Sequence, residues 1–222
     1  MTDFAARREA MVDRQIAARG IRDPHLLEAM RAVPREAFVP AALAGLAYED
    51  SPLPIEAGQT ISQPYIVALM IEAAGIAPGA AVLEIGAGSG YAAAVIGRIA
   101  ERVIAIERHG ELAALAEARM RRMGYGNVSI VHGDGSTGKS DGAPFDAILA
   151  AASGSHVPEA LKRQLAIGGI LVMPIGEPGA VQTLVAVTRT GDESYRTRDL
   201  GPVRFVPLIG EEGWKEERGS AP

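Results

Sequence analysis

Glycine and carboxylate residues cluster around one short apolar run and could form a ligand site. The run 81–86 leads into Gly86, Gly88 and Gly90, and a helical pattern begins directly afterwards. Three alternating glycines are more than a tight turn needs, and they allow a ligand to approach the backbone closely. The pattern therefore predicts a small-molecule site where a strand passes into a helix.

The spacing and charge of this glycine loop separate two classes of ligand. A dinucleotide site has the pattern G-x-G-x-x-G, whereas this loop is G-x-G-x-G, with Tyr91 where a third small residue would stand. Glu84 lies two residues before the first glycine, and its carboxylate would repel a pyrophosphate. S-adenosylmethionine carries a sulfonium and an ammonium group and no phosphate, so an acidic loop suits it. The loop favours S-adenosylmethionine over a dinucleotide.

Two further carboxylates follow neighbouring apolar runs. Glu107 ends the run 102–107, where it could accept hydrogen bonds from both hydroxyls of a ribose. Asp134 follows the run 127–132 and could accept a hydrogen bond from an adenine amino group, although an aspartate in a turn is ordinary on its own. The position of Glu107 relative to the glycine loop favours the ribose role over a solvated charge.

A second glycine-rich stretch, residues 133–140, matches the phosphate-binding pattern G-x-x-x-x-G-K-[ST]. That pattern works when it leads into a helix whose N-terminus faces the phosphates. Here Ser140 is followed by Asp-Gly-Ala-Pro and another apolar run, and Asp134 would bring negative charge to the anion. We interpret the stretch as a surface loop with a solvated Lys139 and expect no ATP binding.

Alternating strands and helices must position these residues. We expect strands at 81–86, 102–107, 127–132, 145–152 and 168–176, with helices at 90–100, 110–123 and 156–166 between them. This order predicts right-handed crossovers and a doubly wound, mainly parallel, Rossmann-like α/β sheet. Extra helices at 4–19, 23–33 and 63–74 precede it, with a polar loop at 50–62. The alternating runs 181–190 and 202–208 predict antiparallel C-terminal strands.

The 222 residues suit a single domain. Its expected parts are N-terminal helices and substrate loop (1–76), cofactor-binding core (77–176), C-terminal strands (177–210) and a frayed polar tail (211–222). The sequence has no cysteine, which excludes disulfides, thiolate metal sites and a cysteine nucleophile and fits a cytoplasmic protein. The net charge of -5 argues against a nucleic-acid partner. The most apolar early stretch, 66–77, is too short to span a bilayer, so we expect no membrane partner.

Motifs along nearly the whole chain resemble the protein-L-isoaspartate O-methyltransferase family of class I S-adenosylmethionine-dependent methyltransferases. The matching motifs are AVPRE with Phe38-Val39, LPI with GQTISQP, LEIGAGSGY, HGDG, PFDAI, GGILVMPIG and VRFVPL. The glycine loop alone is typical of all class I methyltransferases, whereas Thr60-Ile61-Ser62-Gln63-Pro64 is far more specific. Ser62 in this loop also has the residue type of a helix N-cap.

The resemblance implies methyl transfer from S-adenosylmethionine to the free carboxylate of L-isoaspartyl residues in damaged proteins, with D-aspartyl residues left open. The ester would then cyclise to a succinimide without the enzyme, and hydrolysis would restore some normal aspartate. Carried over by position, Ser62 matches the catalytic serine. The cofactor contacts implied are Ile61, Glu84, Gly86, Ala87, Gly88, Gly90, Glu107, Arg108, Asp134 and Gly135. The peptide contacts implied are Thr60, Ser62, Val203, Phe205, Val206 and Pro207. We expect a monomer and no metal.

Three positions depart from the family's pattern and bear on the peptide site. Glu56 replaces a common glycine, Ser136 stands where an aromatic residue often follows HGDG, and Ser153 stands where a proline is often found. We expect the fold and the cofactor site to survive these changes, whereas the peptide-site geometry depends on them.

The implied chemistry requires no general base. An aspartyl-type carboxylate has a pKa near 4 and is already ionised at neutral pH, so we assign none of the histidines to catalysis. Two alternatives remain open. One is a methyltransferase of the same fold that acts on a small molecule or RNA, and the other is a non-catalytic protein that binds S-adenosylmethionine. The acidic charge and the TISQP loop count against RNA, and Ser62 counts against a non-catalytic protein.

Overall fold

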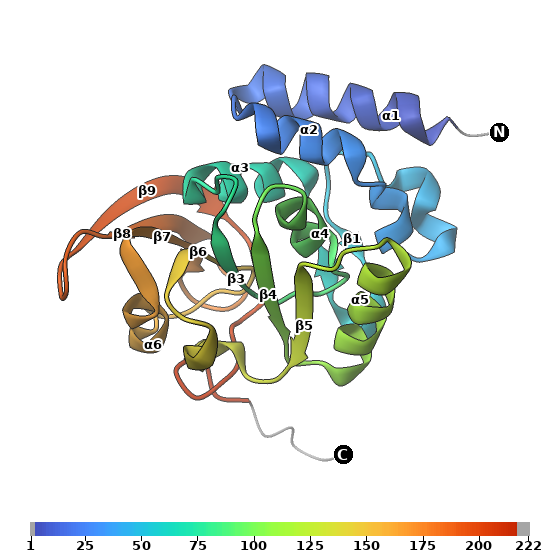
Figure 1. Cartoon of the computed structure of the whole chain (residues 1–222). Coiled ribbons are helices and arrows are strands. Elements are labelled where there is room, and N and C mark those ends of the chain that lie inside the picture. The colour runs from blue at the N-terminus through green and yellow to red at the C-terminus, as the bar shows by residue number, and fades with distance from the viewer. Residues whose placement is uncertain (1–2, 217–222) are drawn as a thin grey trace, which may run out of the picture.

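The centre of the fold is a seven-stranded sheet, seen in a computed structural model that describes residues 3–216 (Figure 1). The strands lie in the order β5-β4-β3-β6-β7-β8-β9. Their bounds are β3 (Ala81–Ile85), β4 (Arg102–Glu107), β5 (Val128–His132), β6 (Phe145–Ala150), β7 (Leu165–Ile175), β8 (Gln182–Arg189) and β9 (Tyr195–Val203). The first five strands in this order are parallel, whereas β8 and β9 pair antiparallel at one edge. The predicted mainly parallel sheet with antiparallel C-terminal strands is confirmed.

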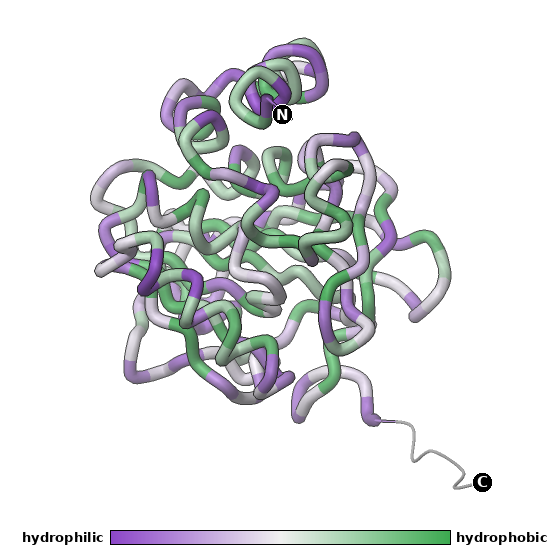
Figure 2. Tube along the Cα trace, turned by 90° about the vertical axis from the view of Figure 1, so that its right-hand side faces the viewer, coloured by the Kyte–Doolittle hydropathy of each residue, from purple (hydrophilic) through white to green (hydrophobic). Residues whose placement is uncertain are grey.

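Both faces of the parallel strands are buried, which explains their continuous apolar runs. In β3, Val82 packs into one hydrophobic cluster, whereas Leu83 and Ile85 pack into the cluster on the opposite face. Helices α3 (Pro64–Ala74), α4 (Tyr91–Gly97) and α5 (Gly110–Arg122) contribute side chains to the first cluster. The short helix α6 (Glu159–Arg163) contributes Leu161 to the second and lies apart from the other helices in Figure 1. In Figure 2, most of the green, apolar stretches of the trace lie in the interior, and most of the purple, polar stretches lie toward the outside.

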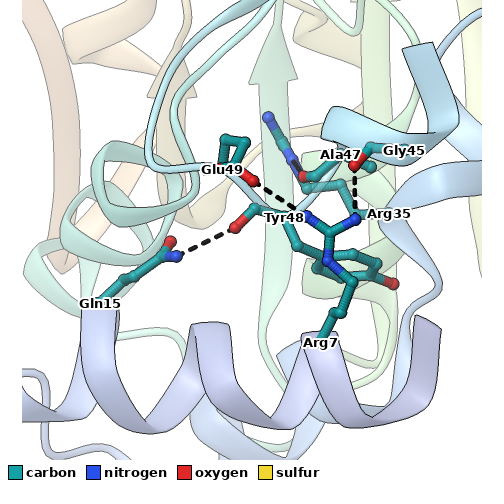
Figure 3. Close-up of polar contacts among 7 residues, drawn as sticks. All are labelled: Arg7, Gln15, Arg35, Gly45, Ala47, Tyr48 and Glu49. Atoms are coloured by element: carbon teal, nitrogen blue, oxygen red, sulfur yellow. Dashed lines mark hydrogen bonds and ion pairs between the residues drawn. The ribbon is translucent and has the colours of Figure 1, made fainter. Parts of the chain in front are cut away.

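The N-terminal region forms the extra helices expected from the sequence. Helix α1 (Phe4–Met11) continues as η1 (Val12–Ile16) and η2 (Ala17–Arg19), and α2 (Pro24–Ala32) is capped by the Asp23 carboxylate. Two more short helices follow, η3 (Arg35–Phe38) and η4 (Ala41–Leu46). Figure 3 shows Arg7 and Gln15 reaching from this region to residues 45–49, where Arg7 bonds Gly45 and Glu49. These contacts tie the first helix to the chain that leads toward Ser62.

Two local features differ from the predicted elements. The loop expected at 50–62 contains a small antiparallel hairpin of β1 (Leu53–Pro54) and β2 (Thr60–Ile61), with η5 (Glu56–Gly58) at its turn. Strands of two residues have no sequence period, so no pattern could indicate them. The helix expected at 156–166 is confined to α6, because β7 already begins at Leu165. The loop expected between β5 and β6 contains only two three-residue 3-10 helices, η6 (Gly135–Thr137) and η7 (Ser140–Gly142).

The C-terminal tail is anchored rather than frayed as far as it is described. The backbone N–H of Glu211 donates a 2.7 Å hydrogen bond to the Asp134 carboxylate, and the Trp214 indole donates to a backbone carbonyl after β6. The expectation of a frayed tail is therefore wrong for residues 211–216, whose polar groups find partners on the core. Residues 217–222 lie outside the described part of the chain. Among residues 3–216, no helix combines the length and apolar character needed to cross a bilayer.

Candidate active site

A cavity of about 960 Å³ lies at the carboxyl ends of the parallel strands. Doubly wound sheets bind ligands at the carboxyl ends of their strands, at the point where the connections from two neighbouring strands run to opposite faces of the sheet. Three predicted groups of residues line the cavity: the glycine loop, the loop around Ser62, and the segment 203–208. The segments are far apart in the sequence, so the fold brings together what the motifs only suggested.

The glycine loop uses its glycines for two different purposes. Gly86 and Gly88 line the cavity and have φ values of 85° and 53°, a left-handed region that favours glycine. Gly90 also has a positive φ but does not line the cavity. A Cβ atom at Gly90 would lie 3.2 Å from the Met120 side chain on α5. The structure therefore places the first two glycines at the cavity and the third at a contact with α5.

Two buried glutamates, Glu84 and Glu107, lie in the wall of the cavity. The Glu107 carboxylate accepts hydrogen bonds of 2.8 Å from the backbone N–H groups of Gly88 and His109, so its position is fixed. Glu84 is only 2% exposed, and its Oε2 has no hydrogen-bond partner among the described residues. Burial, helped by the nearby charge of Glu107, raises the pKa of Glu84 to about 8. The cavity thus holds one fixed carboxylate and one carboxyl group that lacks a counter-charge.

The turn after β5 brings only part of its predicted residues to the cavity. Gly135 lines it, and a Cβ atom there would lie 2.4 Å from the Ile85 side chain. Asp134 does not line it, because its carboxylate turns toward Ser136 and the C-terminal tail. Burial alone would raise the pKa of Asp134, but hydrogen bonds from Glu211 and Ser136 outweigh burial and lower this pKa below its usual value. In this arrangement, Asp134 organises the turn around Gly135.

Ser62 lines the cavity between β2 and α3, but it is not the cap of the helix. Gln63 occupies the cap position, and no side chain caps the helix there, so the suggestion that Ser62 is the N-cap is wrong. The Ser62 carbonyl accepts a 2.8 Å hydrogen bond from Arg35, a fully buried residue that also donates to Ala47 (Figure 3). Burial lowers the pKa of Arg35, and its guanidinium lies 4.8 Å from the Tyr91 ring centre. Nothing in the motif indicated this support for Ser62.

The remaining predicted residues all lie along the cavity. These are Thr60, Ile61, Ala87, Arg108, Val203, Phe205, Val206 and Pro207. The sequence interpretation missed several lining residues, including Ala151 and Ala152 after β6 and Val181 before β8. Val181 is 57% exposed and Val206 is 39% exposed, so both present apolar surface to solvent. Small or exposed apolar residues in loops carry no sequence signal for a site.

Two of the three departures have clear partners in the structure. Ser136 is fully buried, and its hydroxyl accepts a 3.0 Å hydrogen bond from the Glu212 N–H. Ser153 is also fully buried, and its hydroxyl accepts a 3.1 Å hydrogen bond from the Gln182 side chain. Each small hydroxyl therefore makes a contact that the larger or cyclic residue could not make.

The third departure, Glu56, links the hairpin to the glycine loop. Its carboxylate lies 3.5 Å from the guanidinium of Arg119, which donates a 3.1 Å hydrogen bond to the Ser89 carbonyl. The neighbouring Ile55 side chain would lie 3.6 Å from a Cβ atom at Gly88. The hairpin therefore lies directly against the glycine loop, and the ion pair between Glu56 and Arg119 links the two.

The unpartnered Glu84 oxygen provides a test of which cofactor fits the cavity. A buried carboxylate without a counter-charge is unfavourable, and a cationic ligand would supply that charge. S-adenosylmethionine is cationic and carries a ribose that could bond to Glu107, so the residues present fit it. A pyrophosphate would add negative charge beside Glu84 and Glu107. Among the described residues there is also no cluster of side chains suited to hold a metal.

This fold and site define a Rossmann-like methyltransferase: a mainly parallel sheet, a glycine loop after its central strand, and a carboxylate at the end of the next strand. The sequence model of the protein-L-isoaspartate(D-aspartate) O-methyltransferase family matches residues 6–213, and the chain belongs to that family.

Curated relatives and solved structures agree with this placement. The chain is 61% identical to protein-L-isoaspartate O-methyltransferase 1 of Rhodopseudomonas palustris strain HaA2, over 96% of this chain and 87% of that protein. It is 59% identical to the enzyme of Methylorubrum extorquens strain PA1, over 93% and 90% of the two chains. A solved protein-L-isoaspartate O-methyltransferase superposes with a TM-score of 0.82 at 30% identity, over 92% of this chain and 66% of that one. A Plasmodium falciparum structure assigned to the same activity, in complex with S-adenosyl-L-homocysteine, gives 0.78 at 26% identity, over 91% and 98%.

Proposed function

We propose that this chain is a protein-L-isoaspartate(D-aspartate) O-methyltransferase, which transfers a methyl group from S-adenosylmethionine to the free carboxylate of L-isoaspartyl residues. The observation that carries the proposal is the continuous cavity. It joins two buried glutamates, which suit a cationic cofactor, to Ser62 and to an exposed segment that suits a peptide. Family membership and the named relatives support the same activity.

The cofactor end of the cavity is formed by residues of fixed position. Gly86 and Gly88 leave room for a ligand against the backbone, and Glu107 offers its remaining lone pairs to ribose hydroxyls. Glu84 can release its proton when a ligand with an ammonium or sulfonium group binds, and its carboxylate then pairs with that positive charge. When bound, S-adenosylmethionine supplies an electrophilic methyl group on its sulfur.

The acceptor end needs orientation rather than proton transfer. The substrate carboxylate is ionised at neutral pH, so no residue has to remove a proton from it. The Ser62 hydroxyl could donate one hydrogen bond and hold an oxygen in line with the methyl group. A bound peptide and cofactor would together exclude water, which would otherwise solvate the carboxylate and weaken its attack. The ester product then cyclises to a succinimide without further help from the chain.

Two peptides that differ only at one residue test the proposal. One contains L-isoaspartate and its twin contains normal aspartate, so their charge and composition are the same. We expect radiolabelled methyl transfer to the isoaspartyl peptide alone. Equal labelling of both peptides, or of neither while the cofactor binds, would contradict the substrate assignment and direct attention to a small-molecule acceptor. A D-aspartyl peptide in the same assay decides whether that isomer is accepted.

The setting of the reaction is also part of the proposal. We infer a monomer in the cytoplasm that acts on damaged proteins and needs neither nucleic acid nor a membrane. The net charge of -5 supports the absence of a nucleic-acid partner, since phosphate binding needs a concentrated basic face. Sedimentation of the purified chain with and without the isoaspartyl peptide measures the oligomeric state directly.

A further inference from the structure

A buried glutamine, Gln182, lies directly behind the segment proposed to bind peptides. It begins β8, is only 2% exposed, and pairs with Val203 across the antiparallel ladder. It does not line the cavity in which the substrate is proposed to bind. Residues 204–208, which do line the cavity, have left the ladder and need another means of support.

The Gln182 side-chain amide supplies that support, because it makes the two hydrogen bonds to Phe205 that the backbone of a neighbouring strand would make. Its Oε1 accepts a 2.7 Å hydrogen bond from the Phe205 N–H, and its Nε2 donates to the Phe205 carbonyl at 3.1 Å. The same Nε2 donates to the Ser153 hydroxyl at 3.1 Å and to the Glu177 carbonyl at 3.3 Å. One amide therefore fixes both backbone groups of Phe205 and ties them to the loop after β6.

Ser153 fixes the next residues from the same loop. Its N–H donates to the Val206 carbonyl at 2.8 Å, and its own carbonyl accepts from the Leu208 N–H at 2.8 Å. Within residues 3–216, the N–H and carbonyl of Arg204 and the N–H of Val206 have no hydrogen-bond partner. Both residues line the cavity. These are the groups that an extended peptide could pair with.

We propose that Gln182 is a positioning residue that sets the register of the Arg204 and Val206 backbone groups relative to Ser62. The inference rests on the proposed function and adds the element that allows the segment to select its substrate. Isoaspartate and aspartate carry the same charge and differ by one methylene in the main chain, so selection depends on distance from a fixed backbone. A displacement of about 1 Å can cost on the order of a hundredfold in rate. An apolar side chain could fill the space of Gln182 but could not hold Phe205.

Replacement by leucine tests this role, because leucine is similar in size and makes no hydrogen bonds. We expect Gln182→Leu to raise the KM for the isoaspartyl peptide by about tenfold, equivalent to about 1.4 kcal/mol of binding. The dissociation constant for S-adenosylhomocysteine should stay within twofold of the wild-type value. Calorimetric titration of the peptide in the presence of S-adenosylhomocysteine should show the same loss of affinity without turnover.

The chain offers a matched control in Gln164. It is 8% exposed, accepts a 2.7 Å hydrogen bond from the Lys139 N–H and donates a 2.8 Å bond to the Thr137 carbonyl. Gln164→Leu therefore removes a similar pair of buried hydrogen bonds from the loop 137–139, whereas Gln182 bonds directly to Phe205. We expect it to lower the melting temperature without raising the peptide KM. Equal increases in peptide KM for both variants would overturn the proposal, because the effect would then be one of general stability.

Hydrogen exchange at Phe205 gives a second measurement that does not depend on activity. Its amide should exchange slowly in the wild-type protein and faster in Gln182→Leu, while amides in the middle of β8 keep their protection. If Gln182→Leu does not fold, Gln182→Glu keeps the acceptor for the Phe205 N–H and loses the donors, so its peptide KM should still rise. A wild-type enzyme that selects isoaspartyl peptide, beside variants with unchanged peptide KM, would refute the role of Gln182 alone. A wild-type chain without this selectivity would instead refute the proposed function.

Discussion

Replacing Glu84 by glutamine changes one charge in the cavity and almost nothing of its shape. Glu84 is buried beside Glu107, and its Oε2 has no partner among the described residues. Its pKa is raised to about 8, mainly by burial and further by the charge of Glu107. The free protein therefore holds this group protonated at neutral pH, and glutamine reproduces that neutral form.

The effect on stability follows from the difference between the folded and unfolded pKa values. An ordinary glutamate has a pKa of 4.5, so between 4.5 and about 8 the folded state keeps a proton that the unfolded state has released. The contribution of Glu84 to the free energy of unfolding is complete below 4.5 and is lost as the pH rises toward 8. Between about pH 6 and about pH 8 the loss amounts to about 2 kcal/mol. In Glu84→Gln, this decrease of the free energy of unfolding with rising pH should be absent.

The same proton links Glu84 to cofactor binding. A cationic ligand favours the carboxylate form, so binding to the wild-type protein below pH 8 should release a proton. Its affinity for S-adenosylmethionine should consequently rise with pH until Glu84 is ionised in the free protein as well. Glu84→Gln should bind more weakly by about 1–3 kcal/mol under alkaline conditions, the range for an interaction with a charged partner. Its affinity should show no pH dependence from this site.

Two measurements decide between this account and its alternatives. Chemical unfolding of the ligand-free proteins at a series of pH values compares their slopes, and calorimetry in buffers of different ionisation enthalpy counts the released protons. Glu101 is exposed, lies just before the start of β4 and does not line the cavity, so Glu101→Gln serves as the control and should change neither result. If the free energy of unfolding depends on pH in the same way for wild type and Glu84→Gln, and binding releases no proton, then Glu84 does not have the raised pKa inferred from its burial.

Three further variants test other parts of the site. Ser62→Ala should reduce turnover on the isoaspartyl peptide and leave cofactor affinity nearly unchanged; an unaltered rate at saturating peptide would remove Ser62 from the mechanism. Glu107→Gln should weaken S-adenosylhomocysteine binding by about 1–3 kcal/mol, and calorimetry with an unaltered dissociation constant but a lower melting temperature would assign Glu107 a structural role only. Calorimetry should detect no ATP binding to the wild-type chain, and ATP binding that disappears in Lys139→Ala would contradict the interpretation of residues 133–140.

The fold could be predicted where sequence periods are long and regular. The buried parallel strands show continuous apolar runs, and Asp23-Pro24 marks the start of α2 as it stands in the structure. The prediction failed where tertiary contacts decide the outcome. Strands β1 and β2 have two residues each and exist because they pair with one another. Helix α6 is short because the residues from Leu165 onward pair in the sheet as β7.

The site shows the same division between local and distant information. The glycine loop and Glu107 could be identified because their chemistry follows from adjacent residues and from the end of a strand. Gly90 and Asp134 share the motifs, yet the structure turns one toward Met120 and the other toward the tail. Gln182 could not be identified at all, because a single glutamine at the start of a strand has no pattern. Its importance arises from the Phe205 backbone, which lies 23 residues away.

Ser62 and residues 203–208 both line the cavity, and in both places a buried polar side chain holds the backbone. Arg35 holds the Ser62 carbonyl at 2.8 Å, and Gln182 holds Phe205 at 2.7 Å. Burying such groups is costly unless their hydrogen bonds are made. Each therefore favours one position of the backbone that it binds over small displacements. A methyl transfer that uses no general base depends on such placement, because alignment of oxygen, methyl and sulfur is the main contribution left to the protein.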